Sequence, residues 1–261
     1  MHQALWASKS GLNAQDTQLS TISNNLANAA TVGFKRDRAV FEDLLYQIQR
    51  QPGGQTSEVS ELPAGLQVGT GVRVVGTQKQ FTNGSIQVTD QALDVAINGR
   101  GFFEVAMPDG SPAYTRNGQL HLSSEGQLVT AGGLELQPGI TIPNDARSVT
   151  IGTDGTVSVV QPGAATATQV GSLQLADFIN PAGLESIGSN LFQETSASGT
   201  PQTLTPGTEG AGQLQQGSLE SSNVDVVEEL VNMITTQRAY EMNSKVISTA
   251  DQMLQYVSQN M

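Results

Sequence analysis

The side chains that could do acid–base or metal chemistry are few in this sequence. The two histidines, His2 and His121, lie far apart in the chain, and there is no cysteine. Disulfides, zinc–thiolate sites and cysteine nucleophiles are therefore excluded. Glu228 and Glu229 are neighbours on a predicted helix, so their carboxylates point in different directions. Because no acid and base converge, we expect no catalytic residue, no metal site and no enzyme activity.

Two glycine-rich segments resemble nucleotide-binding loops only superficially. Gly69-Thr70-Gly71 precedes a predicted strand and lacks the spacing of a dinucleotide-binding loop, and no helix follows it. Residues 98–101, NGRG, are typical of a hairpin connection. No serine lies in a G-x-S-x-G nucleophile elbow. We therefore expect no bound cofactor.

The charge of the chain restricts its partners. A net charge of −12 over 261 residues argues against nucleic acid, which needs clustered Lys and Arg, and against an anionic membrane surface. No apolar run approaches the roughly 20 residues that span a bilayer. The first residues contain no apolar signal region, which predicts export, if any, without a cleaved signal peptide.

Leucines recur at every seventh position near the N-terminus. Ile22 lies at the complementary position of the same pattern, and the leucines are Leu5, Leu12, Leu19 and Leu26. A seven-residue period places them on a narrow stripe of one helix. Gly33 follows, and its access to the left-handed conformation predicts that the helix ends there.

The C-terminal segment repeats this pattern in another register. The residues at seven-residue spacing are Val226, Met233, Tyr240, Ile247, Leu254 and Met261. The stripe is widened by Leu230, Ile234, Val246, Ala250, Met253 and Val257. Either Asn223 or Asp225 can cap the start of this helix.

Both stripes are narrow and suit a coiled-coil seam. Pairing of the two helices with each other and with other copies is one interpretation, and packing as two amphipathic helices on their own domain is the alternative. For the first interpretation the predicted subunit-packing residues are Leu5, Leu12, Leu19, Ile22, Leu26, Val226, Leu230, Met233, Tyr240, Ile247 and Leu254.

Between the helices the chain is expected to form short strands separated by turns. Asp109-Gly110, Glu125-Gly126 and Asp154-Gly155 each lie between apolar runs, a strong hairpin signal. Residues 93–97 and 173–175 are among the predicted strands. The fold class is α+β: terminal helices paired as a coiled-coil-like domain, with an inserted antiparallel β-rich domain and extended linkers.

The expected boundaries follow from this pattern. Residues 1–34 and 222–261 form the helical polymerisation domain, residues 35–70 a linker with its own composition, residues 71–205 the β-rich outer domain, and residues 206–221 the return linker.

Both ends of the chain resemble the flagellar basal-body rod and hook protein family. The resemblance rests on residues 24–35, NNLANAATVGFK, on residues 219–225, LESSNVD, and on segments 228–241 and 246–254. Residues 94–103 and 114–118 resemble the β domain of the family. The signature positions are Asn24, Asn25, Asn28, Gly33, Phe34, Asn223 and Arg238.

The resemblance implies a structural subunit that polymerises helically into a hollow, rigid shaft in the basal body and transmits torque to the hook. It implies export by the flagellar type III apparatus. The implied partners are further copies of the chain, proximal-rod proteins, the hook protein and the surrounding ring (bushing) proteins, with no nucleic acid and no membrane insertion.

The segment at 46–63 indicates which member of the family the chain resembles. It is similar to a segment of distal-rod proteins that hook proteins lack and that is thought to stiffen the rod; a proximal-rod or hook-family paralogue is the alternative. The positions expected to carry this role are Tyr46, Gln49, Pro52, Gly53 and Pro63.

Overall fold

The computed structural model describes residues 2–51, 55–57, 60–61, 64–163 and 166–259. The chain divides into two units. The helical unit contains the residues up to Ala27, residues 37–78 and those from Asp225 onward, and the β unit contains residues 28–36 and 79–224. Pro52, Gly53 and Pro63 lie outside the described residues.

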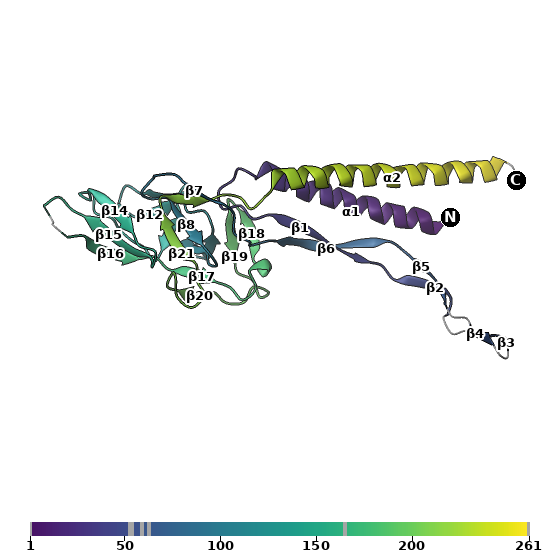
Figure 1. Ribbon diagram of the computed structural model, residues 1–261, viewed down its shortest axis with the longest axis horizontal. Helices are drawn as coiled ribbons and strands as arrows, with labels where there is room; N and C mark the ends of the chain where they lie inside the picture. The colour runs from purple at the N-terminus through teal and green to yellow at the C-terminus, as the bar shows by residue number, and fades with distance from the viewer. Residues whose placement is uncertain (1, 52–54, 58–59, 62–63, 164–165, 260–261) are drawn as a thin grey trace. The chain divides into compact units, whose positions relative to one another are not determined.

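The helical unit is built on two helices that run antiparallel side by side (Figure 1). They are α1, His2–Ala27, and α2, Val226–Gln259. Asp225 caps α2, since its Oδ1 accepts hydrogen bonds from the backbone N–H of Val227 at 2.9 Å and of Glu228 at 3.2 Å.

The prediction that α1 ends at Gly33 is wrong. The helix ends at Ala27, and Gly33 lies beyond it in the β unit. Gly33 does have a positive φ of 70°, but a neighbouring chain segment requires it. A Cβ at this position would lie 2.8 Å from the backbone carbonyl of Arg116.

The segment expected to be a linker, 35–70, contains strands. β1, Asp37–Asp43, pairs with β6, Val72–Lys79, and β2, Tyr46–Arg50, pairs antiparallel with β5, Leu66–Gly69. Two short strands follow β2, namely β3, Gln55–Ser57, and β4, Ser60–Glu61. We call the paired β1, β6, β2 and β5 the ribbon. Backbone pairing, and not an apolar core, holds these two-stranded ladders together.

The β unit contains a seven-stranded sheet in the order β11-β12-β13-β9-β10-β19-β18. Its strands are β9 Phe103–Ala106, β10 Pro112–Thr115, β11 Leu120–Leu122, β12 Leu128–Thr130, β13 Glu135–Gln137, β18 Glu185–Gly188 and β19 Leu191–Gln193. The hairpins predicted at Asp109-Gly110 and Glu125-Gly126 are confirmed by the antiparallel pairs β9–β10 and β11–β12.

Smaller sheets complete the β unit. A three-stranded sheet consists of β14 Ser148–Ile151, β15 Thr156–Val160 and β16 Thr168–Ser172, and its first hairpin turns at Asp154-Gly155 as predicted. The remaining pairs are β17 Leu175–Asp177 with β20 Gln202–Leu204, β21 Gln213–Gln216 with β8 Val95–Asn98, and β22 Ser218–Glu220 with β7 Ile86–Val88. One turn of 3-10 helix, η1 Pro181–Gly183, precedes β18.

Two expectations for this region are wrong. Residues 98–101 do not connect a hairpin, because β8 pairs with β21 while β9 pairs with β10 and β13. Residues 173–175 are not one strand, since β16 ends at Ser172 and β17 begins at Leu175. Both local patterns are overridden by pairing with strands that are distant in sequence.

The β unit contains two apolar clusters. The larger centres on fully buried residues such as Val105 and Leu173, and the smaller is aromatic, with Phe102 and Phe178 at a ring distance of 5.8 Å. In the helical unit, the described apolar residues that are buried are Ala14, Ile22 and Ala39. This difference in buried apolar surface predicts that the β unit is the more stable of the two.

Candidate functional site

The contact between α1 and α2 is formed largely by small and polar residues. Asn243 donates a hydrogen bond from Nδ2 to Oε1 of Gln15 at 3.2 Å. A Cβ at Gly11 would lie 3.1 Å from the same Asn243 side chain, so the helices approach closely there. Ala14 is buried beside this contact. The small side chains at this point let the two helix backbones come close together.

The predicted packing residues differ in their exposure. On α1, Ile22 is buried, whereas Leu5, Leu12, Leu19 and Leu26 are half-buried. On α2, Met233, Ile247 and Leu254 are half-buried, and Val226, Leu230 and Tyr240 are exposed. Within one copy of the chain, only one of these residues is therefore fully covered.

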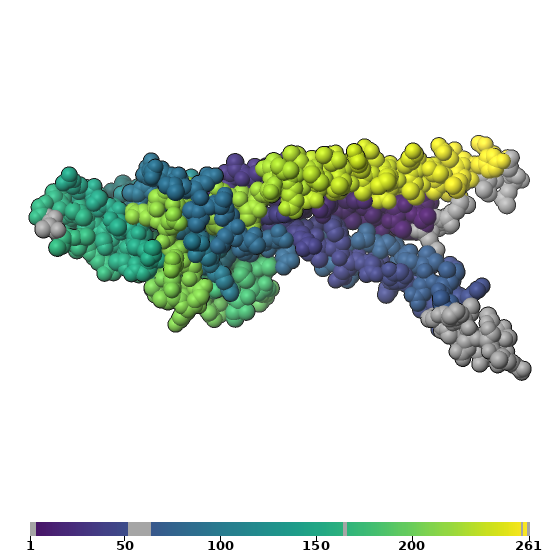
Figure 2. Space-filling view, viewed as in Figure 1, coloured from purple at the N-terminus to yellow at the C-terminus, as the bar shows by residue number. Residues whose placement is uncertain are grey.

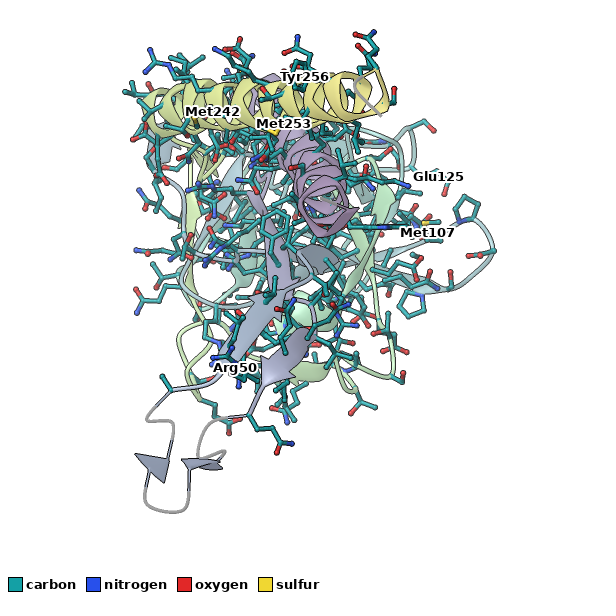
Figure 3. The ribbon with its side chains drawn as sticks, turned by 90° about the vertical axis from the view of Figure 1, so that its right-hand side faces the viewer. Arg50, Met107, Glu125, Met242, Met253 and Tyr256 are labelled. Atoms are coloured by element: carbon teal, nitrogen blue, oxygen red, sulfur yellow. The ribbon has the colours of Figure 1, made fainter. Side chains whose placement is uncertain are left out.

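A second apolar stripe on α2 is exposed along much of the helix. We call it the outer stripe; it consists of Val227, Val231, Ile234, Met242, Val246, Met253 and Tyr256. Their spacing of three, four, seven or eight residues keeps them on one side of a helix. Met253 is 55% exposed and Tyr256 is 70% exposed. Figure 2 shows α2 uncovered along its length on the side toward the viewer, and Figure 3 labels Met242, Met253 and Tyr256.

An open apolar groove interrupts this surface near the start of α1. Its volume is about 540 Å³, and it is lined by Ala4, Met242, Lys245, Val246, Thr249, Ala250 and Met253. Large exposed apolar surface of this kind is typical of an interface that a partner covers. The heptad pattern names Ile234, Val246 and Met253, but it misses Val227, Val231, Met242 and Tyr256, which lie outside its register.

The ribbon is attached to α1 at two points. Asn25 forms a reciprocal pair with the backbone of Asp37, with both hydrogen bonds at 2.9 Å. Ser10 accepts a hydrogen bond on Oγ from the N–H of Val72 at 3.2 Å, and it donates to the carbonyl of Ala7. The signature residue Asn25 therefore orients the start of the ribbon. Asn24 lies next to this pair, with Nδ2 at 3.5 Å from Oδ2 of Asp37.

The ribbon itself exposes large apolar side chains. Tyr46, Ile48 and Leu66 are more than half exposed, and Leu45 is 89% exposed. Gln49 is exposed as well. A polar ribbon with several uncovered large side chains has the composition of a protein interface rather than of a solvated loop.

In the β unit, three distant segments of the chain are clasped together. The backbone N–H of Gly33 donates to the carbonyl of Glu220 at 2.8 Å. Asn223 accepts from the N–H of Arg36 at 2.7 Å and donates to the carbonyl of Gln80 at 2.8 Å. One asparagine side chain thus joins the segment that follows α1, the segment that enters the β unit and the segment that leads to α2. Asn223 makes these contacts and is not the cap of α2.

Buried charges complete this clasp, which we define as Gly33, Lys35, Arg116, Glu220 and Asn223. Lys35 Nζ lies 2.6 Å from Glu220 Oε1, and Arg116 Nη1 lies 3.4 Å from Glu220 Oε2. The side chains of Lys35, Arg116 and Glu220 are 0%, 2% and 1% exposed. Lys35 also donates to the carbonyl of Thr82 at 2.8 Å, and the N–H of Gly84 donates to Glu220 at 2.9 Å.

The clasp holds two cations on one carboxylate. Burial lowers the pKa of Lys35 below its usual value, and the charge of Arg116 lowers it further, while Glu220 opposes both. Burial also lowers the pKa of Arg116. Arg116 offsets part of its desolvation by donating to the carbonyl of Gly99 at 2.7 Å and by stacking its guanidinium 5.4 Å from the ring of Phe102.

The other signature residues have local roles. Asn28 Oδ1 accepts from the hydroxyl of Thr31 at 3.2 Å, and Phe34 is buried with the ammonium of Lys79 at 5.1 Å from its ring centre. Arg238 is exposed on α2, and its side chain makes no hydrogen bond or ion pair with the residues that the structure describes.

Three protein families match this chain. The flagella basal body rod protein family matches residues 6–35, the flagellar hook protein FlgE/F/G D1 domain matches residues 96–159, and the flagellar basal body rod FlgEFG protein C-terminal family matches residues 215–260.

Full-length relatives agree with these matches. The chain is 56% identical to the flagellar basal-body rod protein FlgG of Buchnera aphidicola subsp. Schizaphis graminum, over 99% of the chain and 100% of the relative. It is 50% identical to FlgG of Caulobacter vibrioides, over 98% of both chains, and 46% identical to FlgG of Borreliella burgdorferi, over 97% of both chains. The chain belongs to the flagellar basal-body rod protein family. It is a structural subunit of the rod, a component of the basal body, and these relatives favour the distal-rod member over a proximal-rod or hook paralogue.

The clasp of this rod subunit lies where the N-terminal and C-terminal family matches meet. The N-terminal match ends at Lys35 and the C-terminal match begins shortly before Glu220, so the two terminal signatures meet in the clasp. Across the described part of the rod subunit, no group of three or more His, Asp or Glu side chains could hold a metal ion. No helix in that part is long and apolar enough to cross a membrane.

Proposed function

We propose that this rod subunit polymerises helically through α1 and α2 into the distal rod, a rigid, hollow shaft that transmits torque from the motor to the hook. The observation that carries this proposal is the outer stripe of α2, together with the groove at Met253. Large apolar residues on a helix that already pairs with α1 need a further helix to cover them. In a polymer, every subunit would supply that surface to its neighbour.

The ribbon supports a stiffening role in this shaft. Its exposed residues Tyr46 and Ile48 are carried by strands that are themselves fixed to α1 through Asn25 and Ser10. A ribbon anchored in this way can brace a neighbouring subunit without moving relative to its own helices. We propose that Tyr46, Gln49 and the segment up to Pro63 lie between neighbouring subunits and limit their sliding.

Family membership supports a set of partners and an export route. We propose contacts with proximal-rod proteins at one end of the polymer, the hook protein at the other, and ring (bushing) proteins around it, after export through the flagellar type III apparatus. A purely structural role, without catalysis, is supported by membership of a family of structural rod proteins. Nucleic acid and membrane insertion are not part of this function, consistent with the net charge of −12.

Replacing Met253 with Glu tests the proposed polymer interface. A charge buried in a helix seam without a partner costs several kcal/mol, and the loss recurs in every subunit. We therefore expect Met253→Glu to abolish rod formation, measured by electron microscopy and sedimentation, while circular dichroism of the monomer is unchanged because Met253 is 55% exposed there.

The matched control is Gln255→Glu, which places the same charge two residues away on the polar side of α2 and should leave assembly intact. Two positions of the heptad pattern, Leu19 and Met233, extend the test, since a charge at either should also block assembly. Normal rods from Met253→Glu would show that the outer stripe is not an interface between subunits.

A further inference from the structure

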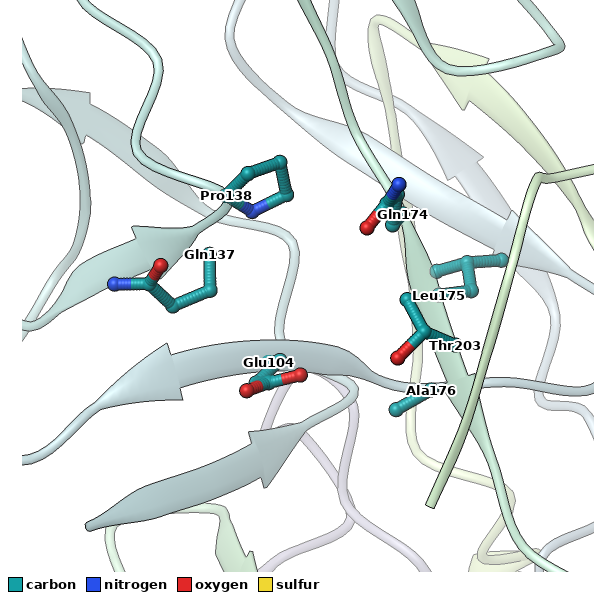
Figure 4. A pocket seen from close by; sticks show the side chains of 7 residues that line it. All are labelled: Glu104, Gln137, Pro138, Gln174, Leu175, Ala176 and Thr203. Carbon is teal, nitrogen blue, oxygen red and sulfur yellow. The ribbon is translucent and has the colours of Figure 1, made fainter.

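A small polar pocket in the β unit is lined by none of the clasp residues. Its volume is about 200 Å³, and its walls come from β9, from the turn after β13, and from the β17–β20 pair (Figure 4). The lining residues are Glu104, Gln137, Pro138, Gln174, Leu175, Ala176 and Thr203. Four separate chain segments therefore build one concavity.

Glu104 is a half-buried carboxylate in this pocket with no compensating cation. The other six lining residues are uncharged. Among the residues that the structure describes, the side chain of Glu104 makes no hydrogen bond and no ion pair. A partly desolvated carboxylate without a partner favours a bound cation, because burial weakens its hydration.

The neighbouring groups add acceptors to this charge. Gln174 and Thr203 carry side-chain oxygens that face the open space beside Glu104 in Figure 4. Neither side chain forms a hydrogen bond within the described part of the chain. Pro138 and Ala176 add apolar surface to the walls, with Ala176 next to its strand partner Thr203 (Figure 4). The pocket thus offers three kinds of acceptor from separate directions, and beside them a surface for methylene groups.

We propose that this pocket binds one primary ammonium group on a short aliphatic stem, as at the end of a lysine side chain. An ammonium carries three donors directed apart, which match a carboxylate, an amide oxygen and a hydroxyl. A guanidinium would need a planar, bidentate partner and would leave Gln174 or Thr203 unused. A hard divalent cation would need six or more oxygen ligands with more than one carboxylate, which the pocket does not contain.

Titration of the soluble chain with n-butylammonium tests this assignment, with n-butanol as the uncharged control. The side-chain amide signals of Gln137 and Gln174 report binding by NMR. We expect saturable shifts with n-butylammonium that weaken as salt is added, and no saturable shift with n-butanol. Absence of a saturable shift, or equal effects of the two compounds, would overturn the proposal.

A pair of variants identifies the charge that is responsible. Glu104→Gln should weaken n-butylammonium binding at least about tenfold, the loss expected for a charge-assisted hydrogen bond. Glu135→Gln removes a carboxylate from the neighbouring strand β13, outside the pocket, and should bind as the wild type does. Equal affinity of wild type and Glu104→Gln would overturn the proposal, and the salt dependence of the wild type tests it independently of either variant.

Cross-linking in assembled rods distinguishes the possible sources of the ammonium. A carbodiimide takes up one proton and adds to the Glu104 carboxylate, which becomes an O-acylisourea. The bound lysine ammonium releases one proton, and its amine attacks the carbonyl carbon. The amide C–N bond forms, the C–O bond to the isourea breaks, and the second proton of the amine passes to the leaving group, which departs as a urea. A peptide of this same chain joined to Glu104 identifies a second copy, and a foreign peptide identifies another rod component. This arm rests on the proposed polymer, whereas the titration does not, so the two can fail separately.

Discussion

Glu220 is a buried carboxylate that lies between two buried cations. Its carboxylate faces the ammonium of Lys35 and the guanidinium of Arg116 with almost no access to water. Buried ion pairs do not necessarily add stability, because desolvation offsets much of the attraction. Their removal is nevertheless costly, because the remaining charges stay buried. The β unit therefore folds favourably only when the segments that carry Lys35, Arg116 and Glu220 are all in place.

Replacing Glu220 with Gln should destabilise the β unit by about 3–5 kcal/mol, because two cations would remain buried without their carboxylate. Denaturant unfolding followed by far-ultraviolet circular dichroism measures this change. The control, Glu185→Gln on the exposed strand β18, should shift stability by less than about 0.5 kcal/mol. Equal stability of the two variants would mean that the clasp does not hold the fold.

The raised pKa of Tyr114 leads us to expect a loss of stability at high pH. Burial raises the pKa of its phenol to about 12, and the charges of Glu104 and Glu194 add to the effect. The unfolded chain ionises near the ordinary value of 10.0, so above that pH the unfolded state binds fewer protons than the folded state. The contribution of Tyr114 is therefore complete below pH 10 and is lost progressively between pH 10 and 12. Tyr114→Phe should remove this part of the pH dependence, measured by denaturant unfolding over that range; an unchanged slope would contradict the assignment.

At the residue scale the sequence predicts identities better than roles. The cap of α2 could be narrowed to Asn223 or Asp225, because capping depends on contacts within one turn, and the structure shows that it is Asp225. Gly33 was correctly singled out, but its role depends on the backbone of Arg116, far away in sequence. Lys35, Arg116 and Glu220 have no local pattern that joins them. Buried charge networks of this kind become visible only once the fold brings the segments together.

Periodicity located the helices, but it did not find every residue of their contact. The heptad leucines of α1 and the C-terminal repeat correspond to α1 and α2, and the contact between the helices also uses Gly11, Gln15 and Asn243. Apolar periodicity cannot find such a contact, because small and polar residues carry no hydrophobic signal. The period of seven also found only part of the outer stripe, because the residues of that stripe are spaced by the 3.6-residue turn of the helix and not by a strict period of seven.

The ribbon could be predicted as a distinctive segment, but not as paired strands. Tyr46-Gln47-Ile48-Gln49 and Val72-Arg73-Val74 do alternate apolar and polar residues, which is a strand signal. The residues between 51 and 66 are nevertheless rich in Gly, Ser and Glu, and no local pattern indicates that β1 pairs with β6 or β2 with β5. The anchors at Ser10 and Asn25 are contacts with α1 that only the fold reveals. Composition alone therefore favoured a linker.

Removing the outer part of the ribbon should change rod shape rather than rod formation. Thr70 Oγ1 donates to the carbonyl of Leu45 at 2.7 Å, so the chain can be closed at this point after deletion of residues 46–69. Strands β1 and β6 and both anchors on α1 remain. We expect export and polymerisation to continue and the rods to be curved, because neighbouring subunits lose the contact that limits their sliding.

Electron microscopy of purified basal bodies measures this curvature. A control chain in which residues 46–69 are retained and the exposed Gln67 of β5 is replaced by Ser should give straight rods, because Gln67 is not among the residues proposed to limit sliding. Straight rods of normal stiffness after the deletion would rule out a stiffening role for the segment.

The two units of the chain differ in how many apolar residues they bury, and we expect them to differ in stability. Both apolar clusters belong to the β unit, whereas few apolar residues of the helical unit are buried. The clasp also belongs to the β unit and uses residues from outside the expected boundaries of 71–205, namely Lys35 and Glu220. The smallest stable part of this rod subunit should therefore include residues 28–36 and 79–224, because a chain limited to 71–205 lacks the ion pairs that fill its interior.

Hydrogen exchange on the verified monomer should show this division directly. Strands such as β9 and β15 lie in a packed core and should exchange only through global unfolding. Amides of residues 5–26 and 226–254 should exchange much faster, because a helix pair with an uncovered outer stripe gains little from packing and isolated helices are marginal in water. Assembly into rods covers the stripe, so protection of the same amides should rise to the level of the β unit. Strong protection of both helices in the monomer would show that the pair is stable by itself, and polymerisation would then dock preformed helices instead of ordering them.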